Sequence, residues 1–92
     1  MGRFLNREYT MEDFRVIKCY PLTEEQTERV NAVINQMIDG YEKKHDTMLD
    51  TSTINCYIES DVNGWYVRLK DMYCEQINMI ERMGDCSEYQ ID

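Results

Sequence analysis

The sequence has little of what marks a catalytic centre or a metal site. It contains one histidine, and its four cysteines are far apart, with no CxxC pair among them. Structural zinc sites normally take ligands from such a close pair, so we expect no metal ion. Glycine-rich phosphate loops and nucleophile elbows are missing as well, so we expect no cofactor. His45 lies in a charged stretch with no residue placed to orient it, and we expect a protein that is not an enzyme.

Long apolar runs, linkers and repeats are also lacking. No stretch approaches the roughly 20 apolar residues that span a bilayer. The arginines near the N-terminus precede no apolar run of the kind that a signal peptide needs. We therefore expect a cytoplasmic protein with reduced cysteines. The 92 residues predict a single domain, 1–92, in which residues 1–12 could form an arm and residues 85–92 a loosely held acidic tail.

Positive charge is scarce. Ten lysines and arginines stand against 18 aspartates and glutamates, which gives a formal net charge of -8. Such a chain repels nucleic acid and anionic membranes, so we expect neither as a direct partner. A basic protein surface is the natural complement of this charge.

The clearest local pattern is a helix from Thr23 to about Tyr41. Thr23 and Gln26 match the capping box, in which each side chain satisfies a free backbone donor of the other residue. The helix could end at Gly40 or continue to Lys44. Apolar residues recur on one face, as in a helix that covers a core: Val30, Val33, Ile34, Met37, Ile38 and Tyr41.

The opposite face of this helix carries only acids and amides. An ordinary solvated face mixes charges of both signs at i,i+4 spacing, whereas this stripe does not. Carboxylates one turn apart are spaced loosely like backbone phosphates, so the stripe could mimic nucleic acid. A solvated helix face remains the alternative. The stripe consists of Glu24, Glu28, Asn31, Asn35, Asp39 and Glu42, of which Glu24, Glu28, Asp39 and Glu42 are candidate partner-binding residues.

Two alternating segments around Asn63-Gly64 predict a β-hairpin over residues 54–70. Asn-Gly favours a tight two-residue turn, because both positions tolerate positive φ. That turn places Glu59 opposite Arg68, a favourable cross-strand pair. A four-residue loop over 61–64 would keep the same faces and lose the pairing, so the tight turn is favoured. The apolar face would hold Ile54, Cys56, Ile58, Val62, Trp65, Val67 and Leu69.

The polar face of this hairpin carries Tyr57, Tyr66 and Arg68 beside Lys70. Tyrosine and arginine are enriched at interface hot spots, so these three residues are further candidates for partner binding. The alternative is that the tyrosines lie half-buried under a helix or a loop. A nucleic-acid stacking platform is disfavoured by the net charge.

The remaining segments complete the expected fold. Residues 14–20 before Pro21 predict a strand, since the residue before proline avoids the helical region, although Thr10 could instead cap a short helix. Residues from about Asp71 to Met83 predict a second helix. The order β-α-β-β-α gives an α+β domain, in which two helices pack on a three-stranded sheet that contains an antiparallel hairpin.

These patterns predict a non-enzymatic, acidic interaction protein that binds and blocks a larger, basic, nucleic-acid-binding protein. In general size and charge the chain resembles small phage-encoded inhibitors of bacterial defence, such as anti-CRISPR and anti-restriction proteins. The likeness is one of type, and no motif supports it. The alternative is a small homodimeric accessory or regulatory module that pairs through the hairpin face.

Overall fold

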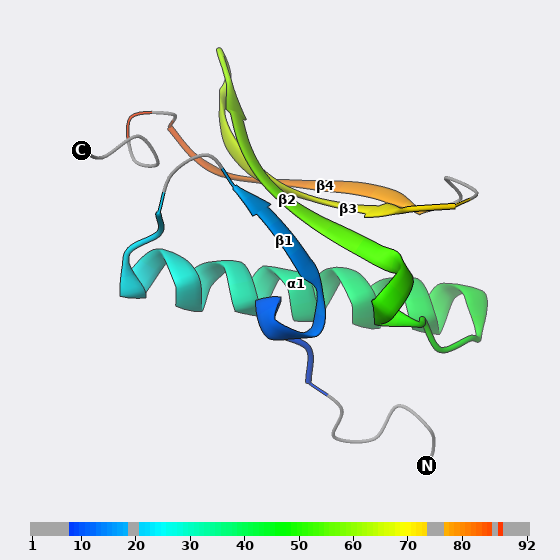
Figure 1. Cartoon of the computed structure of the whole chain (residues 1–92). Helices are drawn as coiled ribbons and strands as arrows, with labels where there is room; N and C mark the ends of the chain where they lie inside the picture. Colours follow the sequence, from blue (N-terminus) through cyan, green and yellow to red (C-terminus); the bar gives the residue numbers. More distant parts are fainter. Residues whose placement is uncertain (1–7, 19–20, 74–76, 86, 88–92) are drawn as a thin grey trace.

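One long helix lies across one face of a four-stranded sheet (Figure 1). The computed structural model describes residues 8–18, 21–73, 77–85 and 87. Residues 1–7 of the expected arm and most of the expected acidic tail lie outside this range. The predicted α+β class is confirmed, with one α-helix and four strands in the described part. The elements are η1 (Met11–Asp13), β1 (Arg15–Lys18), α1 (Glu24–His45), η2 (Thr51–Thr53), β2 (Ile54–Asp61), β3 (Gly64–Asp71) and β4 (Asn78–Gly84).

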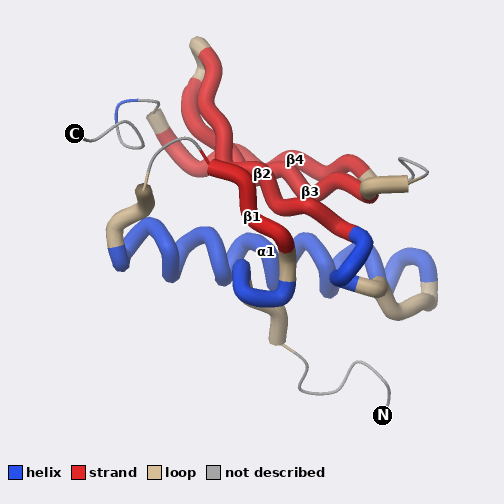
Figure 2. The backbone as a smooth tube through the Cα atoms, in the orientation of Figure 1, coloured by secondary structure: helices blue, strands red, loops and turns tan. Residues whose placement is uncertain are grey.

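The strands lie in the order β1-β2-β3-β4, which Figure 2 shows as one layer beside α1. β1 runs parallel to β2, and the other neighbours are antiparallel. Parallel neighbours need a crossover connection, which α1 provides. The predicted first strand is confirmed at Arg15–Lys18, while residues 19–20 lie outside the described range. The alternative helix is also present, because Thr10 caps the short η1.

The predicted first helix is confirmed, and it continues through Gly40 to His45. Thr23 Oγ1 accepts a hydrogen bond from the Gln26 N–H at 3.1 Å, and the Gln26 side chain accepts one from the Thr23 N–H at 2.9 Å. The helix ends at Asp46, which takes the left-handed conformation (φ 51°). The sheet-facing stripe of the helix is fully buried at Val30, Ile34 and Ile38.

The hairpin forms with a different turn from the one that the sequence favoured. Asp61 pairs with Gly64, so the two turn residues are Val62 and Asn63. The reason lies in the flanking residues: an Asp61 oxygen accepts a hydrogen bond from the Asn63 N–H at 2.9 Å, and Gly64 alone of these residues takes a positive φ (130°). Aspartate first and glycine fourth is the pattern of a type I turn.

Two predictions about this hairpin are therefore wrong. Glu59 lies opposite Tyr66 and not opposite Arg68, because the register is that of the longer loop. Val62 is not on the apolar face but 93% exposed at the tip of the hairpin. The other apolar residues of the two strands keep their predicted face, since both registers preserve the alternation.

The predicted second helix is wrong: β3 continues to Asp71, and residues 78–84 form β4. Apolar residues at 77, 79, 80 and 83 are compatible with a helical period and nearly with a strand period. The free edge of β3 decides between them, because its backbone N–H and C=O groups need partners. β4 supplies these partners along six residue pairs, from Lys70↔Asn78 to Trp65↔Gly84. The expected three-stranded sheet thus has a fourth strand where a second helix was expected.

Candidate functional site

The two faces of the sheet differ in what covers them. The inner face packs on α1, and its residues Ile58, Trp65, Val67 and Leu69 are fully buried. No described element covers the opposite face (Figure 1), which we call the uncovered face. The register places side chains of all four strands on it: Arg15, Ile17, Asn55, Tyr57, Glu59, Asp61, Tyr66, Arg68, Lys70, Asn78, Ile80 and Arg82.

The centre of the uncovered face consists of tyrosine rings with arginines over them. The guanidinium carbon of Arg68 lies 5.0 Å from the ring centroid of Tyr57, and that of Arg82 lies 4.9 Å from the centroid of Tyr66. Guanidinium groups at this distance are attracted by the aromatic quadrupole. The three predicted site residues Tyr57, Tyr66 and Arg68 are therefore brought together, and each is half-buried.

At the end of the uncovered face near the hairpin turn, each acid has an arginine partner. Both carboxylate oxygens of Asp61 accept hydrogen bonds from Arg82, at 2.7 and 2.9 Å. The Arg82 side chain and the Asn63 N–H together hold the pKa of Asp61 at about 2. Glu59 lies 3.2 Å from Arg68, so this predicted pair forms as a diagonal contact. A hydrogen bond with Glu59 also raises the pKa of Tyr66.

At the other end of the uncovered face, the cations have no acidic partner among the residues that the structure describes. Arg15, Asn55, Lys70 and Asn78 form one row across the four strands. Neither Arg15 nor Lys70 makes an ion pair with a described residue. The uncovered face carries four cations and two acids, so its net charge is +2 in a chain of net charge -8.

The predicted acidic stripe of α1 is buried at one end and exposed at the other. Glu42 was expected on the outer face, but it is 2% exposed. Its Oε2 accepts hydrogen bonds from the Tyr9 hydroxyl and from the Leu49 N–H, both at 2.8 Å. The backbone N–H groups of Tyr9 and Met11 donate to the Asn35 and Asn31 side chains of the same stripe. The segment before β1 thus covers this edge of the helix, and Glu42 has no surface to offer a partner.

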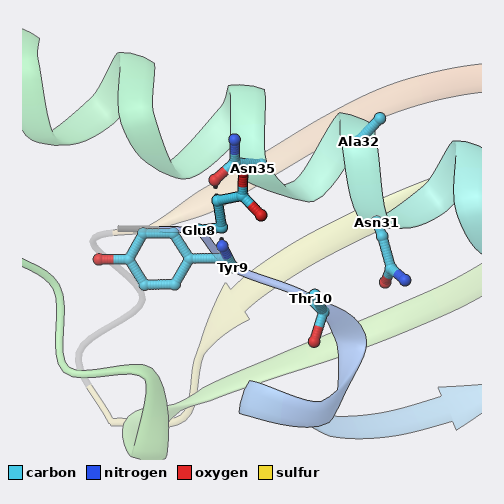
Figure 3. Close-up of a pocket in the computed structure, with 6 residues that line it drawn as sticks. All are labelled: Glu8, Tyr9, Thr10, Asn31, Ala32 and Asn35. Atoms are coloured by element: carbon cyan, nitrogen blue, oxygen red, sulfur yellow. Dashed lines mark hydrogen bonds between the residues drawn. The ribbon is translucent and has the colours of Figure 1, made fainter. Parts of the chain in front are cut away.

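A shallow pocket of about 270 Å³ lies where this segment meets α1 (Figure 3). The amide oxygens of its two asparagines already accept hydrogen bonds from backbone N–H groups of the segment. The Cys56 thiol is buried elsewhere, and burial raises its pKa to about 12, so it is no nucleophile at neutral pH. The pocket is lined by Glu8, Tyr9, Thr10, Asn31, Ala32 and Asn35.

The rest of the stripe stays at the surface. Asp39 is half-exposed and pairs with Lys43 at 3.1 Å, one turn along the helix. Glu24 and Glu28 are exposed, and their carboxylates make no hydrogen bond or ion pair with a described residue. Three further glutamates on or beside α1 share this state, as Glu81 does on β4. The sequence pattern missed the three, two of them because they reach α1 only through tertiary packing. We call the five the helix-side carboxylates: Glu8, Glu12, Glu24, Glu25 and Glu28.

Other kinds of site find no support in the part of the chain that the structure describes. Its helices include none with the length and apolarity needed to cross a membrane. Its histidine, cysteine, aspartate and glutamate side chains form no group of three or more that could hold a metal ion. Comparisons of the chain with protein-family models, curated proteins and solved structures found no match.

Proposed function

We propose that this chain is a non-enzymatic interaction protein that binds a basic protein surface through its helix-side carboxylates. One observation supports this: the acids of the uncovered face have arginine partners, whereas the five helix-side carboxylates have none among the described residues. The uncovered face has a net charge of +2. Because the whole chain has a net charge of -8, the residues outside this face together carry -10.

The arrangement of these carboxylates suits a long-range electrostatic contact. Glu24 and Glu28 lie one turn apart near the N-terminus of α1. η1 begins at Met11, whose N–H donates a hydrogen bond to the Asn31 side chain one turn further along α1, so Glu12 lies near the same stretch of helix. Exposed charges of one sign accelerate association with an oppositely charged surface, and salt weakens their contribution.

The partner class that we propose is a larger protein whose nucleic-acid-binding groove is basic. By occupying such a groove, the chain would act as an inhibitor, in the manner of a small phage protein directed against a bacterial defence system. Asp39 and the acids of the last eight residues would add to the attraction. Glu42 is left out of this surface because it is buried.

The test is quantitative capture from a bacterial lysate with three immobilised baits. These are the wild type, Glu24→Lys/Glu28→Lys, and the control Glu81→Lys/Asp85→Lys, which makes the same charge change at exposed residues elsewhere. The captured protein is then purified, and its affinity is measured by calorimetry at low and high salt. We expect the first double variant to lose at least about tenfold in affinity, or 1.4 kcal/mol. The control, in which only Asp85 belongs to the acidic tail, should lose clearly less.

Two results would contradict this function. A partner that binds Glu24→Lys/Glu28→Lys as tightly as the wild type would show that the helix-side carboxylates are not the contact. A partner whose affinity does not change with salt would show that charge does not drive the association. Addition of DNA or RNA should also displace the chain from its partner, since both would occupy one groove.

A further inference from the structure

The uncovered face is a second surface, separate from the helix-side carboxylates. We infer that a second copy of this chain covers it, so that two uncovered faces pack against each other around a two-fold axis. This axis crosses the strands between the row of Tyr57 and the row of Glu59. The dimer does not depend on the function proposed above, because it uses other residues.

Charge along the strands supports a copy of the same chain as the occupant. Arg15 and Lys70 give one end of the face a net charge of +2, and neither has an acidic partner among the described residues. Glu59 and Asp61 outnumber Arg82 at the other end, which has a net charge of -1. A two-fold interface must be complementary to itself. The rotation places the cationic end of each copy over the acidic end of the other. A partner of one charge sign would match one end of the face and repel the other.

The middle of the face has the chemistry of an interface. Ile17 is 38% exposed and Ile80 is 53% exposed, and they lie at the two ends of the row that contains Tyr57 and Arg68. Stacked tyrosine and arginine flanked by aliphatic side chains is typical of interface centres. Packing against a second copy would remove the apolar surface of both isoleucines from water.

Unsatisfied polar atoms gather on the same face. Among the described residues, three buried side-chain atoms lack a hydrogen bond: Asn55 Oδ1, Glu59 Oε1 and Arg68 Nε. Glu59 Oε1 is within 3.2 Å of an Arg68 nitrogen and so still belongs to an ion pair. The three atoms comprise two acceptors and one donor. A second copy offers both kinds of group, so a small side-chain shift on packing can satisfy them.

The size of the face indicates how strong the dimer is. Four strands about 4.8 Å apart and about seven residues long, at ~3.3 Å per residue, give a flat area of about 450 Å² per copy. Two copies bury about 900 Å², which is at the low end for specific interfaces. We therefore expect a weak dimer, with a dissociation constant of about 10–100 µM. The two helices lie on the outside, so the helix-side carboxylates of both copies remain exposed.

Sedimentation equilibrium of the full chain from about 5 µM to 1 mM tests the dimer. The weight-average mass should rise from 11.1 kDa toward twice that value. Ile80→Glu should weaken the association at least tenfold, and so should Arg15→Glu/Lys70→Glu. Lys44→Glu on the exposed side of α1 is the charge control and should leave it unchanged. Circular dichroism checks that each variant is folded.

A charge-swap mixture tests the orientation. Arg15→Glu/Lys70→Glu and Glu59→Lys/Asp61→Lys should each be monomeric alone, because like charges then face each other in both contacts of the dimer. Their mixture should restore the dimer, since opposite charges face each other in both contacts again. Far-UV circular dichroism must show that the second variant keeps its sheet after the loss of its arginine pairs.

Three outcomes would overturn the inference. These are a monomer at 1 mM, a dimer that is insensitive to Ile80→Glu and to Arg15→Glu/Lys70→Glu, and a mass that grows beyond two copies. None of them bears on the helix-side carboxylates, whose test is the capture of a basic partner. Conversely, a failed capture leaves the dimer untouched.

Discussion

The two faces of this sheet are formed by the same strands but differ in burial and in the interactions of their side chains. On the inner face, Ile58, Val67 and Leu69 are closed off by α1 and exclude all solvent. On the uncovered face, the intervening residues Tyr57, Arg68 and their neighbours stay half-exposed and interact through stacking and ion pairs. Alternation sorts side chains between faces, and the position of a single helix decides which face becomes the core. The core is thus on the inner face, and the uncovered face presents stacked and ion-paired side chains.

The largest difference in stability should come from replacing an isoleucine by alanine on each face in turn. Ile58→Ala removes a fully buried side chain of β2 and should lower the free energy of unfolding by about 3–4 kcal/mol. Ile80→Ala removes a 53% exposed side chain of β4 and should cost less than about 1 kcal/mol. Urea denaturation at about 2 µM, below the dissociation constant of about 10–100 µM expected for the dimer, measures both. Equal losses would mean that the uncovered face is buried as well.

The next largest loss of stability is expected at the close contact between Gly64 of β3 and Gly84 of β4. Gly64 has φ 130°, and a Cβ there would meet the carbonyl oxygen of Gly84 far inside contact distance. Gly64→Ala should therefore destabilise the fold by about 2–3 kcal/mol, since neither the backbone angle nor the space suits alanine.

The matched control for this joint is Gly40→Ala in α1, where a Cβ would meet no atom within 4 Å. This variant should be more stable than the wild type by about 0.5–1 kcal/mol, because alanine favours the helix interior. Thermal unfolding of the two variants side by side provides the measurement. A Gly64→Ala protein as stable as the wild type would show that the edge of β4 can move away from β3.

A smaller effect tests the contact between Tyr9 and the buried Glu42 of α1. Tyr9→Phe removes the hydroxyl that donates to buried Glu42 and should cost about 1.5–2 kcal/mol, as expected for a hydrogen bond to a charged group. Tyr73→Phe, at a side chain that is 77% exposed, is the control and should change stability by less than about 0.5 kcal/mol. Hydrogen exchange should also speed up in residues 9–14. If Tyr9→Phe left stability and exchange unchanged, the hydrogen bond to Glu42 would not form in solution, and Glu42 would belong to the solvated stripe.

The smallest effect concerns the acidic end of the uncovered face. Asp61 has a pKa of about 2 in the folded protein and about 3.9 when unfolded. Its lowered pKa therefore contributes stability above pH 4, and this contribution is lost as the pH falls from about 4 to 2. Asp61→Asn should flatten the dependence of the unfolding midpoint on pH in this window. Arg82→Gln should flatten it as well, because Arg82 is the largest cause of the shift. An unchanged slope in both variants would show that the pair is not formed in solution.

Local patterns were sufficient where one rule acted alone. The Thr23–Gln26 capping box and the 3.6-residue period placed α1, because both signals lie within a few residues of one another. Alternation placed Tyr57, Tyr66 and Arg68 on one face, and this holds in either register, because both keep the period of two. Proline at position 21 indicated the strand that precedes it, and the structure has β1 there.

Local patterns failed where a distant segment decided the outcome. Glu42 fits an outer stripe on a helical wheel, but Tyr9, 33 residues earlier in the chain, binds its carboxylate and covers it. Residues 78–84 fit a helix, but the open edge of β3 recruits them as a strand. The hairpin register depended on Asp61, whose role at the turn also involves Arg82 on another strand.

The sequence by itself determined the long helix, the composition of both faces of the hairpin and the excess of negative charge, because each follows from spacing or counting along the chain. Only the tertiary structure decided which acids are available to a partner. Glu42 is buried, Asp61 and Glu59 pair with arginines, and the helix-side carboxylates have no partner among the described residues. The physical reason is that a carboxylate is a binding group only where no donor reaches it, and the donors come from segments far away in sequence.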